Sequence, residues 1–135
     1  MTSDAPMIVL GIDVGGTKIA AGLVQFPNGE VLAERSIPTN SAQGGRAALD
    51  RITSMAEALV EEGRACGHAP AVIGLGLCEL VDPSGCILSH NCLAFTEAEA
   101  CERLTRLAPL FIEADVRAGA RAEALFGAGR AYRIV

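Results

Sequence analysis

The chain has 135 residues, 50% of them hydrophobic and few aromatic, with a formal net charge of −5. This length suits one domain and is enough to bury a core. The eleven Lys and Arg residues are scattered along the chain, so we expect no basic surface for nucleic acid. The apolar runs are too short to span a bilayer, and residues 1–6 lack signal-peptide features, so we expect a cytoplasmic protein without membrane contact.

Apolar patterns predict three strands, then helices alternating with further strands, in the order βββαβαβα. Apolar residues at helical spacing, together with Thr96 as an N-cap and Gly67 and Pro109 as stops, define the helices. The predicted strands cover residues 7–14, 19–26, 31–37, 72–78 and 110–112, with a short edge strand at 86–88 and the start of another at 132–135. The predicted helices cover residues 44–66, 97–107 and 115–126.

The five cysteines indicate reduced thiols in a cytosolic protein. Their number is odd and no two of them form a C-x-x-C pair, which argues against an oxidised secreted scaffold. Cys86, His90 and Cys92 form a C-x-x-x-H-x-C cluster. That spacing is not a common zinc pattern, so we interpret it as a chance cluster of buried thiols.

The segment Gly11-Ile12-Asp13-Val14-Gly15-Gly16-Thr17-Lys18 lies between two predicted strands and carries the clearest chemical signal. Two glycines in a tight turn let the backbone approach a ligand closely, and successive N–H groups there form an anion-binding concavity. Thr17 adds a hydroxyl donor, Lys18 a positive charge, and Asp13 a carboxylate that can hold Mg²⁺ directly or through water. This set suits phosphoryl transfer.

Two other interpretations of the glycine-rich segments are weaker. A Walker A loop needs Lys before Ser or Thr and a following helix, whereas here Thr17 precedes Lys18 and a strand follows. A hairpin turn without a ligand is the second alternative, and it is less favoured because Asp, Gly, Gly, Thr and Lys occur together between two apolar strands. Gly74 and Gly76 lack the third glycine of a dinucleotide fingerprint, so we interpret them as small residues that let a strand pack closely.

The hairpin at residues 13–18 is similar to the phosphate-1 hairpin of the actin-like ATPase superfamily, which includes sugar kinases, actin and heat-shock chaperones. Within that superfamily, residues 72–77 and 81–85 point to the ROK family, because they resemble its segment I-G-[IV]-G-x-P-G-x-V-D-x-x-x-G. Asn91 falls at the Asn of that family's Pro-Asn-Leu stretch. Residues 113–115, 122–124 and 126–129 resemble its Glu-Asn-Asp-Ala-Asn-Ala stretch and the A-E-x-x-x-G-A-G continuation.

This resemblance implies an ATP-dependent sugar kinase that uses Mg²⁺. The Asp that matches Asp115 is the general base of such kinases and accepts the proton of the sugar hydroxyl as that oxygen attacks ATP. From the residues alone, a helix N-cap is the alternative role for Asp115. Gly15, Gly16, Thr17 and Lys18 would hold phosphate, with Asp13 as the metal residue. Asn91, Asp115 and Glu79 would lie at the sugar.

Several residues depart from the family pattern near the expected sugar. The family's Pro-Gly is Cys78-Glu79 here, and the Asn before the base is Ala114. Arg117 replaces the next Asn, and His90 replaces the Pro before Asn91. These changes indicate a substrate other than plain glucose, or a decayed sugar site.

We therefore expect an α/β domain of the ribonuclease-H-like, actin-like ATPase type, with a mixed five-stranded sheet and helices on both faces. Residues 1–135 would form the N-terminal domain of a ROK kinase, inactive without the absent C-terminal domain. The family's zinc motif would lie beyond Val135, and the full-length form allows a homodimer. The alternatives are a degenerate, non-catalytic binding domain and a ROK transcriptional regulator. The second is disfavoured because only six residues precede Met7, which leaves no room there for a helix-turn-helix domain.

Overall fold

A mixed five-stranded sheet forms the centre of the fold, as the sequence predicted. The structure is a computed structural model that describes residues 5–127. The strand order is β3-β2-β1-β4-β5; β1, β4 and β5 are parallel, whereas β2 is antiparallel to both of its neighbours. The strands are β1 (Met7–Val14), β2 (Lys18–Phe26), β3 (Glu30–Pro38), β4 (Val72–Leu77) and β5 (Leu110–Ala114).

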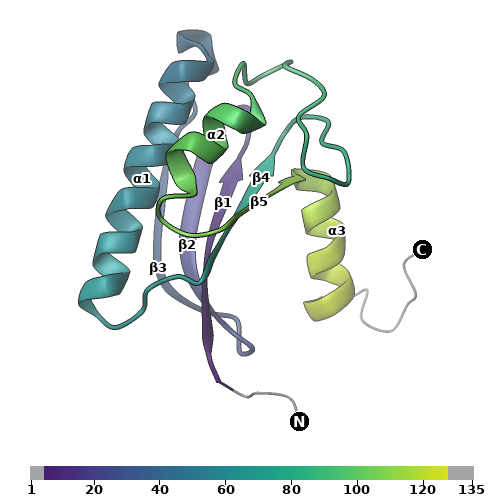
Figure 1. Ribbon diagram of the computed structural model, residues 1–135. Helices are drawn as coiled ribbons and strands as arrows, with labels where there is room; N and C mark the ends of the chain where they lie inside the picture. The colour runs from purple at the N-terminus through teal and green to yellow at the C-terminus, as the bar shows by residue number, and fades with distance from the viewer. Residues whose placement is uncertain (1–4, 128–135) are drawn as a thin grey trace.

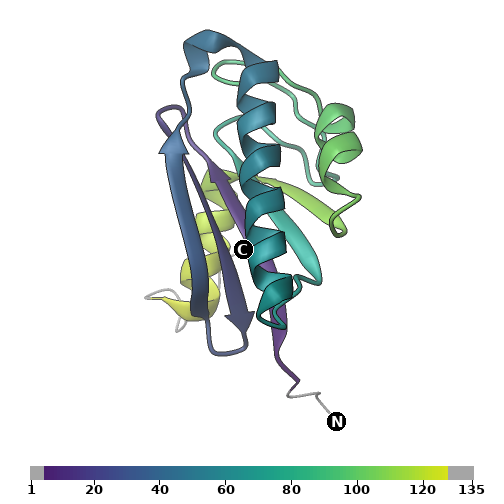
Figure 2. The ribbon, with the colours of Figure 1, turned by 90° about the vertical axis from the view of Figure 1, so that its left-hand side faces the viewer.

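Helices lie on both faces of this sheet, which confirms the second part of the prediction. Helices α1 (Gly45–Ala65) and α2 (Glu97–Leu104) cover one face, and α3 (Asp115–Phe126) lies behind the other (Figure 1, Figure 2). A short 3₁₀ turn, η1 (Ser41–Gln43), leads into α1. In the part of the chain that the structure describes, no helix combines the length and apolarity needed to cross a membrane.

The core lies between α1 and the sheet. Alternate residues of β1 are buried on this side, as expected for a strand with one face toward the core. Leu49, Ile52 and Leu59 recur at helical spacing on α1 and are at most 1% exposed. Phe95, in the loop before α2, is also buried in this core and anchors that loop to the rest of the domain.

The opposite face of the sheet carries small residues. Gly11 of β1 lies between Gly22 of β2 and Gly74 of β4 in register. We expected Gly74 and Gly76 of β4 to permit close packing, and this was wrong for Gly74: a Cβ there, or at Gly11 of β1, would meet nothing within 4 Å, whereas a Cβ at Gly76 would have neighbours at 3.7–4.0 Å. These glycines instead leave a hollow of about 1150 Å³ between the sheet and α3.

Two local predictions differ from the structure. Helix α2 ends at Leu104, where the Thr105 hydroxyl bonds to the Cys101 carbonyl and the chain tightens into a turn. The expected edge strand at 86–88 is reduced to one bridge between Val81 and Ile87. The η1 turn was not predicted, and the strand expected at 132–135 lies outside the described residues.

Candidate active site

The ends of three parallel strands place the predicted site residues at one edge of the sheet. Because β1, β4 and β5 run in the same direction, their carboxyl ends lie together. The glycine hairpin follows β1, the long loop of residues 78–96 follows β4, and α3 begins directly after β5 (Figure 1). Segments far apart in the sequence therefore meet at this edge.

The glycine hairpin is closed by a hydrogen bond from the Gly15 N–H to the Lys18 carbonyl, with an N···O distance of 2.9 Å. A Cβ at Gly15 would lie 3.1 Å from that carbonyl oxygen, so the tight turn favours glycine. Within residues 5–127, the N–H groups of Gly16 and Thr17 donate to no protein acceptor. They remain available to an anion, which is the property predicted for this hairpin.

Thr39 supports the hairpin through hydrogen bonds, a role that the sequence analysis did not predict. It is fully buried, and its hydroxyl donates to the Gly15 carbonyl at 2.7 Å. Its N–H donates to the Thr17 carbonyl at 2.8 Å, while Arg51 donates to the Thr39 carbonyl at 3.1 Å. A threonine after the end of a strand has no distinguishing pattern, because its partners come from a turn more than twenty residues earlier.

Asp13 and Asp115 lie on either side of Gly76. A Cβ at Gly76 would be 3.9 Å from Oδ1 of Asp13 and 4.0 Å from Cα of Asp115. Both aspartates line the hollow between the sheet and α3, and Lys18 lines it too. Within the described residues, neither carboxylate takes part in an ion pair. Two carboxylates and an ammonium group thus face one space.

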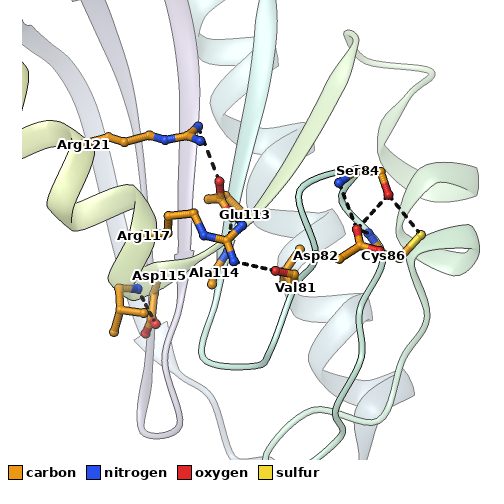
Figure 3. Close-up of polar contacts among 10 residues, drawn as sticks. Val81, Asp82, Ser84, Cys86, Glu113, Ala114, Asp115, Arg117 and Arg121 are labelled. Carbon is orange, nitrogen blue, oxygen red and sulfur yellow. Dashed lines mark hydrogen bonds and ion pairs between the residues drawn. The ribbon is translucent and has the colours of Figure 1, made fainter. Parts of the chain in front are cut away.

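Asp115 is the first residue of α3, and Ala114 occupies the N-cap position. The N-cap alternative for Asp115 is therefore wrong. Its Oδ1 accepts a hydrogen bond from the Val116 N–H at 2.7 Å (Figure 3). A helix N-terminus favours a negative charge, so the position suits an ionised aspartate.

Arg117, which replaces an Asn of the family pattern, joins α3 to its surroundings. Its guanidinium group donates to Oε1 of Glu113 at 2.7 Å and to the Val81 carbonyl at 2.8 Å (Figure 3). Arg121, one turn later, lies 3.4 Å from Oε2 of Glu113. These contacts tie the first turns of α3, and with them Asp115, to β5 and to the loop after β4.

Asp82 shapes the first part of that loop. Its Oδ1 accepts hydrogen bonds from the Cys86 N–H and from both the N–H and the hydroxyl of Ser84 (Figure 3). The bonds from Cys86 and then Ser84 lower the pKa of Asp82 below its usual value. Asp82 thus takes the Cys86 N–H and Glu97 accepts from the Ile87 N–H, so two N–H groups of the strand expected at 86–88 bond to carboxylates instead of a neighbouring strand.

Glu79 is buried, and its carboxylate organises the second part of the loop. Oε1 accepts from the N–H groups of Cys92 and Leu93, at 2.6 and 3.1 Å. Oε2 accepts from the Ser89 hydroxyl and the Asn91 N–H, at 2.5 and 3.0 Å. Burial would raise the pKa of Glu79, but these bonds outweigh it and lower the pKa from 4.5 to about 2.

The structure therefore separates the residues predicted to contact the sugar. Asp115 lines the hollow, whereas Glu79 is only 6% exposed and directs its carboxylate into its own loop. Asn91 is exposed, and its position is set by its backbone bond to Glu79. Direct contact of Glu79 with a sugar stays a prediction, but its observed contacts are those of a residue that positions Asn91.

The C-x-x-x-H-x-C residues do not gather into a metal centre. Within residues 5–127, the group whose potential ligand atoms lie within 4.8 Å of one another is Cys78, Glu79 and Cys92. His90 instead places Nδ1 3.2 Å from the Leu93 carbonyl oxygen. Sequence spacing missed this group because Cys78 reaches Cys92 through the fold of the loop.

Two sugar kinases are similar in sequence to most of this chain. A glucokinase of Streptomyces coelicolor is 30% identical over 132 residues, covering 95% of this chain. An N-acetylmannosamine kinase of Shigella flexneri is 34% identical over 121 residues, covering 87%. The chain spans 39% of the length of either relative.

The comparison with solved structures also finds a sugar kinase. A ROK family glucokinase from Streptomyces griseus, solved with glucose and AMPPNP, matches with a TM-score of 0.75 and 28% identity. The match covers 90% of this chain and 38% of that protein. The sequence profile of the ROK family matches residues 9–135. By this match the chain belongs to the ROK family.

Proposed function

We propose that residues 1–135 form the phosphate-binding N-terminal domain of an ATP-dependent sugar kinase, whose second domain lies outside this chain. The proposal draws on the two kinase relatives and on the structure solved with glucose and an ATP analogue. The matched region is about two fifths of each relative, so the complete enzyme would be more than twice as long.

The observation that carries this proposal is the pair of aspartates flanking Gly76, with Lys18 in the same hollow. Asp115 would act as general base. As the sugar hydroxyl oxygen forms a bond to the γ-phosphorus, its proton passes to the Asp115 carboxylate, and the bond from γ-phosphorus to the bridging oxygen breaks to release ADP. Such a base contributes about 10²–10⁴-fold to the rate.

The glycine hairpin would hold the phosphates of ATP. The N–H groups of Gly16 and Thr17, which have no protein acceptor among the described residues, would supply donors, and the ammonium group of Lys18 would supply positive charge. Asp13 has an exposed carboxylate without an ion pair in the described residues, which fits a residue that holds Mg²⁺ directly or through water. That ion would neutralise charge developing on the phosphate oxygens.

The loop of residues 89–93 would form the sugar side of the site. Glu79 fixes its backbone, and the exposed side chain of Asn91 would bond to a sugar hydroxyl. Ala114 has no polar group to offer where the family pattern has Asn. The proposed substrate is therefore a sugar bound with one fewer amide contact than the family pattern provides.

Expression of the complete reading frame tests this function. The purified protein should release ADP from ATP in the presence of glucose or N-acetylmannosamine, and mass spectrometry should find the phosphorylated sugar. The 135-residue chain alone should not turn over, because half of the nucleotide cleft would be absent. Steady sugar-dependent ADP release by the short chain would contradict the domain assignment.

A non-catalytic sugar- or nucleotide-binding domain is the second candidate. It is favoured by the buried Ala114 beside the proposed base and by the engagement of Glu79 inside the protein. Calorimetry on the complete protein separates the two. A binding domain would bind sugar or nucleotide without forming phosphorylated sugar, whereas a kinase would form it.

A further inference from the structure

Two cysteines that the proposed chemistry does not use lie side by side at the site edge. Cys78 directly follows β4, and Cys92 belongs to the loop held by Glu79. Their sulfur atoms and the nearer oxygen of Glu79 are all within 4.8 Å of one another. Fourteen positions separate the two thiols in sequence, so the bonds from the loop to Glu79 bring them together.

Glu79 does not make this cluster a metal site. Its two oxygens already accept four hydrogen bonds, two each, from residues 89–93. A carboxylate offers about four acceptor positions, so none remains for a cation without breaking the loop. The two thiols are therefore the reactive part of the cluster.

The two thiols differ in access. Cys92 is exposed, whereas Cys78 is partly buried. Burial first, and then the neighbouring Cys92 and Glu79, raise the pKa of the Cys78 thiol to about 11. A thiolate is the species that reacts with oxidants, and reaction also requires exposure. Cys92 should therefore react first and Cys78 second.

We propose that Cys78 and Cys92 form a reversible intramolecular disulfide when the protein meets a peroxide. The Cys92 thiol gives up its proton, its thiolate attacks one peroxide oxygen, and the O–O bond breaks; Cys92 becomes a sulfenic acid, and the departing hydroxide takes up that proton to form water. The Cys78 sulfur then attacks the Cys92 sulfur, the S–O bond breaks, and the released hydroxide takes the Cys78 proton. Two thiols and one hydrogen peroxide give one disulfide and two waters.

Formation of the disulfide would change the surroundings of the glycine hairpin. A Cβ at Gly16 would lie 3.6 Å from the Cys92 sulfur, so this sulfur already borders the hairpin. Bonding to Cys78 requires an S–S distance of about 2.0 Å. The two sulfurs must therefore approach each other as the bond forms, and any shift of Cys92, or the new S–S bond itself, changes the surroundings of the Gly16 amide.

Peptide mapping tests the proposal directly. No Lys or Arg lies between Arg64 and Arg103, so trypsin leaves all five cysteines in one peptide. Cleavage after glutamate instead yields peptides 63–79 and 80–97, which a disulfide between Cys78 and Cys92 would join. Changing Cys66→Ser and Cys86→Ser leaves one candidate cysteine in each peptide and serves as the background for the assay.

After treatment with about one equivalent of hydrogen peroxide, we expect the two peptides to be joined and then separated by dithiothreitol. In the same background, Cys78→Ser should leave Cys92 as a sulfenic acid that dimedone traps, and Cys92→Ser should abolish the linkage. The Gly16 amide resonance should shift on oxidation and return on reduction. Two free thiols after treatment, or disulfide found only between chains, would overturn the proposal even if the kinase function holds.

Discussion

Replacing Glu79 with Gln should destabilise the loop that carries Asn91. The substitution keeps the shape of the side chain but removes its charge and turns one acceptor oxygen into an NH₂ donor. Whichever way the amide faces, two of the four groups that now donate to Glu79 face the NH₂ group and lose their acceptor, and the other two keep only a neutral one. The site is 6% exposed, so water does not readily replace the lost bonds.

The expected size of the effect follows from the pKa of Glu79. A shift from 4.5 to about 2 corresponds to roughly 3 kcal/mol of folding free energy at neutral pH, at 1.36 kcal/mol per pKa unit. Two buried donors without acceptors give a similar range, at about 1–3 kcal/mol each. We expect Glu79→Gln to lower the free energy of unfolding by about 3 kcal/mol, as measured by urea denaturation followed by circular dichroism.

The loss of stability in Glu79→Gln should also depend on pH. The folded pKa of Glu79 is below the unfolded one, so its stabilisation is complete above about pH 5 and is lost as the pH falls toward 2. The gap between wild type and Glu79→Gln should therefore narrow in that window. Asp82, whose pKa is also lowered, is present in both proteins and does not affect the difference.

A matched control is Glu61→Gln, an exposed change on α1 that should alter stability by less than about 0.5 kcal/mol. If Glu79→Gln matches this control at pH 7, or if its effect is the same at pH 3 and pH 7, the carboxylate does not hold the loop by its charge.

Three other substitutions test the site and its support. Thr39→Val removes the hydroxyl bond to Gly15 and should cost about 1–3 kcal/mol in urea denaturation; no change would mean that the hairpin does not need this support. Gly76→Ala adds a methyl group between the two aspartates at contact distances of 3.7–4.0 Å, so it should leave the melting temperature nearly unchanged but reduce sugar phosphorylation by the complete protein. Gly74→Ala, on the same face of β4 with open space around it, should change neither the melting temperature nor the rate, and equal rates for the two variants would refute this placement. Gly45→Ala would put a Cβ 2.2 Å from the Ala94 carbonyl oxygen and should lower the free energy of unfolding by several kcal/mol in the same denaturation assay. A loss of less than about 1 kcal/mol would show that the loop before α2 moves aside at little cost.

Much of the fold could be predicted because strong local patterns and tertiary packing agree. Residues 7–14 alternate between the core and the open face, and the helix predicted at 44–66 differs by one residue at each end from α1. Thr96 caps α2 as expected, accepting from the Glu99 N–H. The errors fall where side chains compete with the backbone. Asp82 and Glu97 accept the N–H groups of Cys86 and Ile87 in the expected strand, and the Thr105 hydroxyl bonds to the Cys101 carbonyl where α2 ends.

The placement of the candidate site residues could be predicted where the residue lies within a recognisable sequence motif. The hairpin glycines have the geometry that their spacing indicated, and Asp13 and Asp115 meet because parallel strands end together. The supporting contacts were not predictable. Thr39 and Glu79 act on segments 22–24 and 10–14 residues away, and nothing in their local sequence marks a buried hydroxyl or a carboxylate with four donors.

Asp115→Asn in the complete protein tests the proposed kinase mechanism most directly. The change keeps the size of the side chain but removes the proton acceptor. We expect kcat for sugar phosphorylation to fall by about 10²-fold or more, with little change in nucleotide affinity or melting temperature. A variant with wild-type kcat would show that Asp115 is not the base, and would contradict the kinase mechanism proposed for this domain.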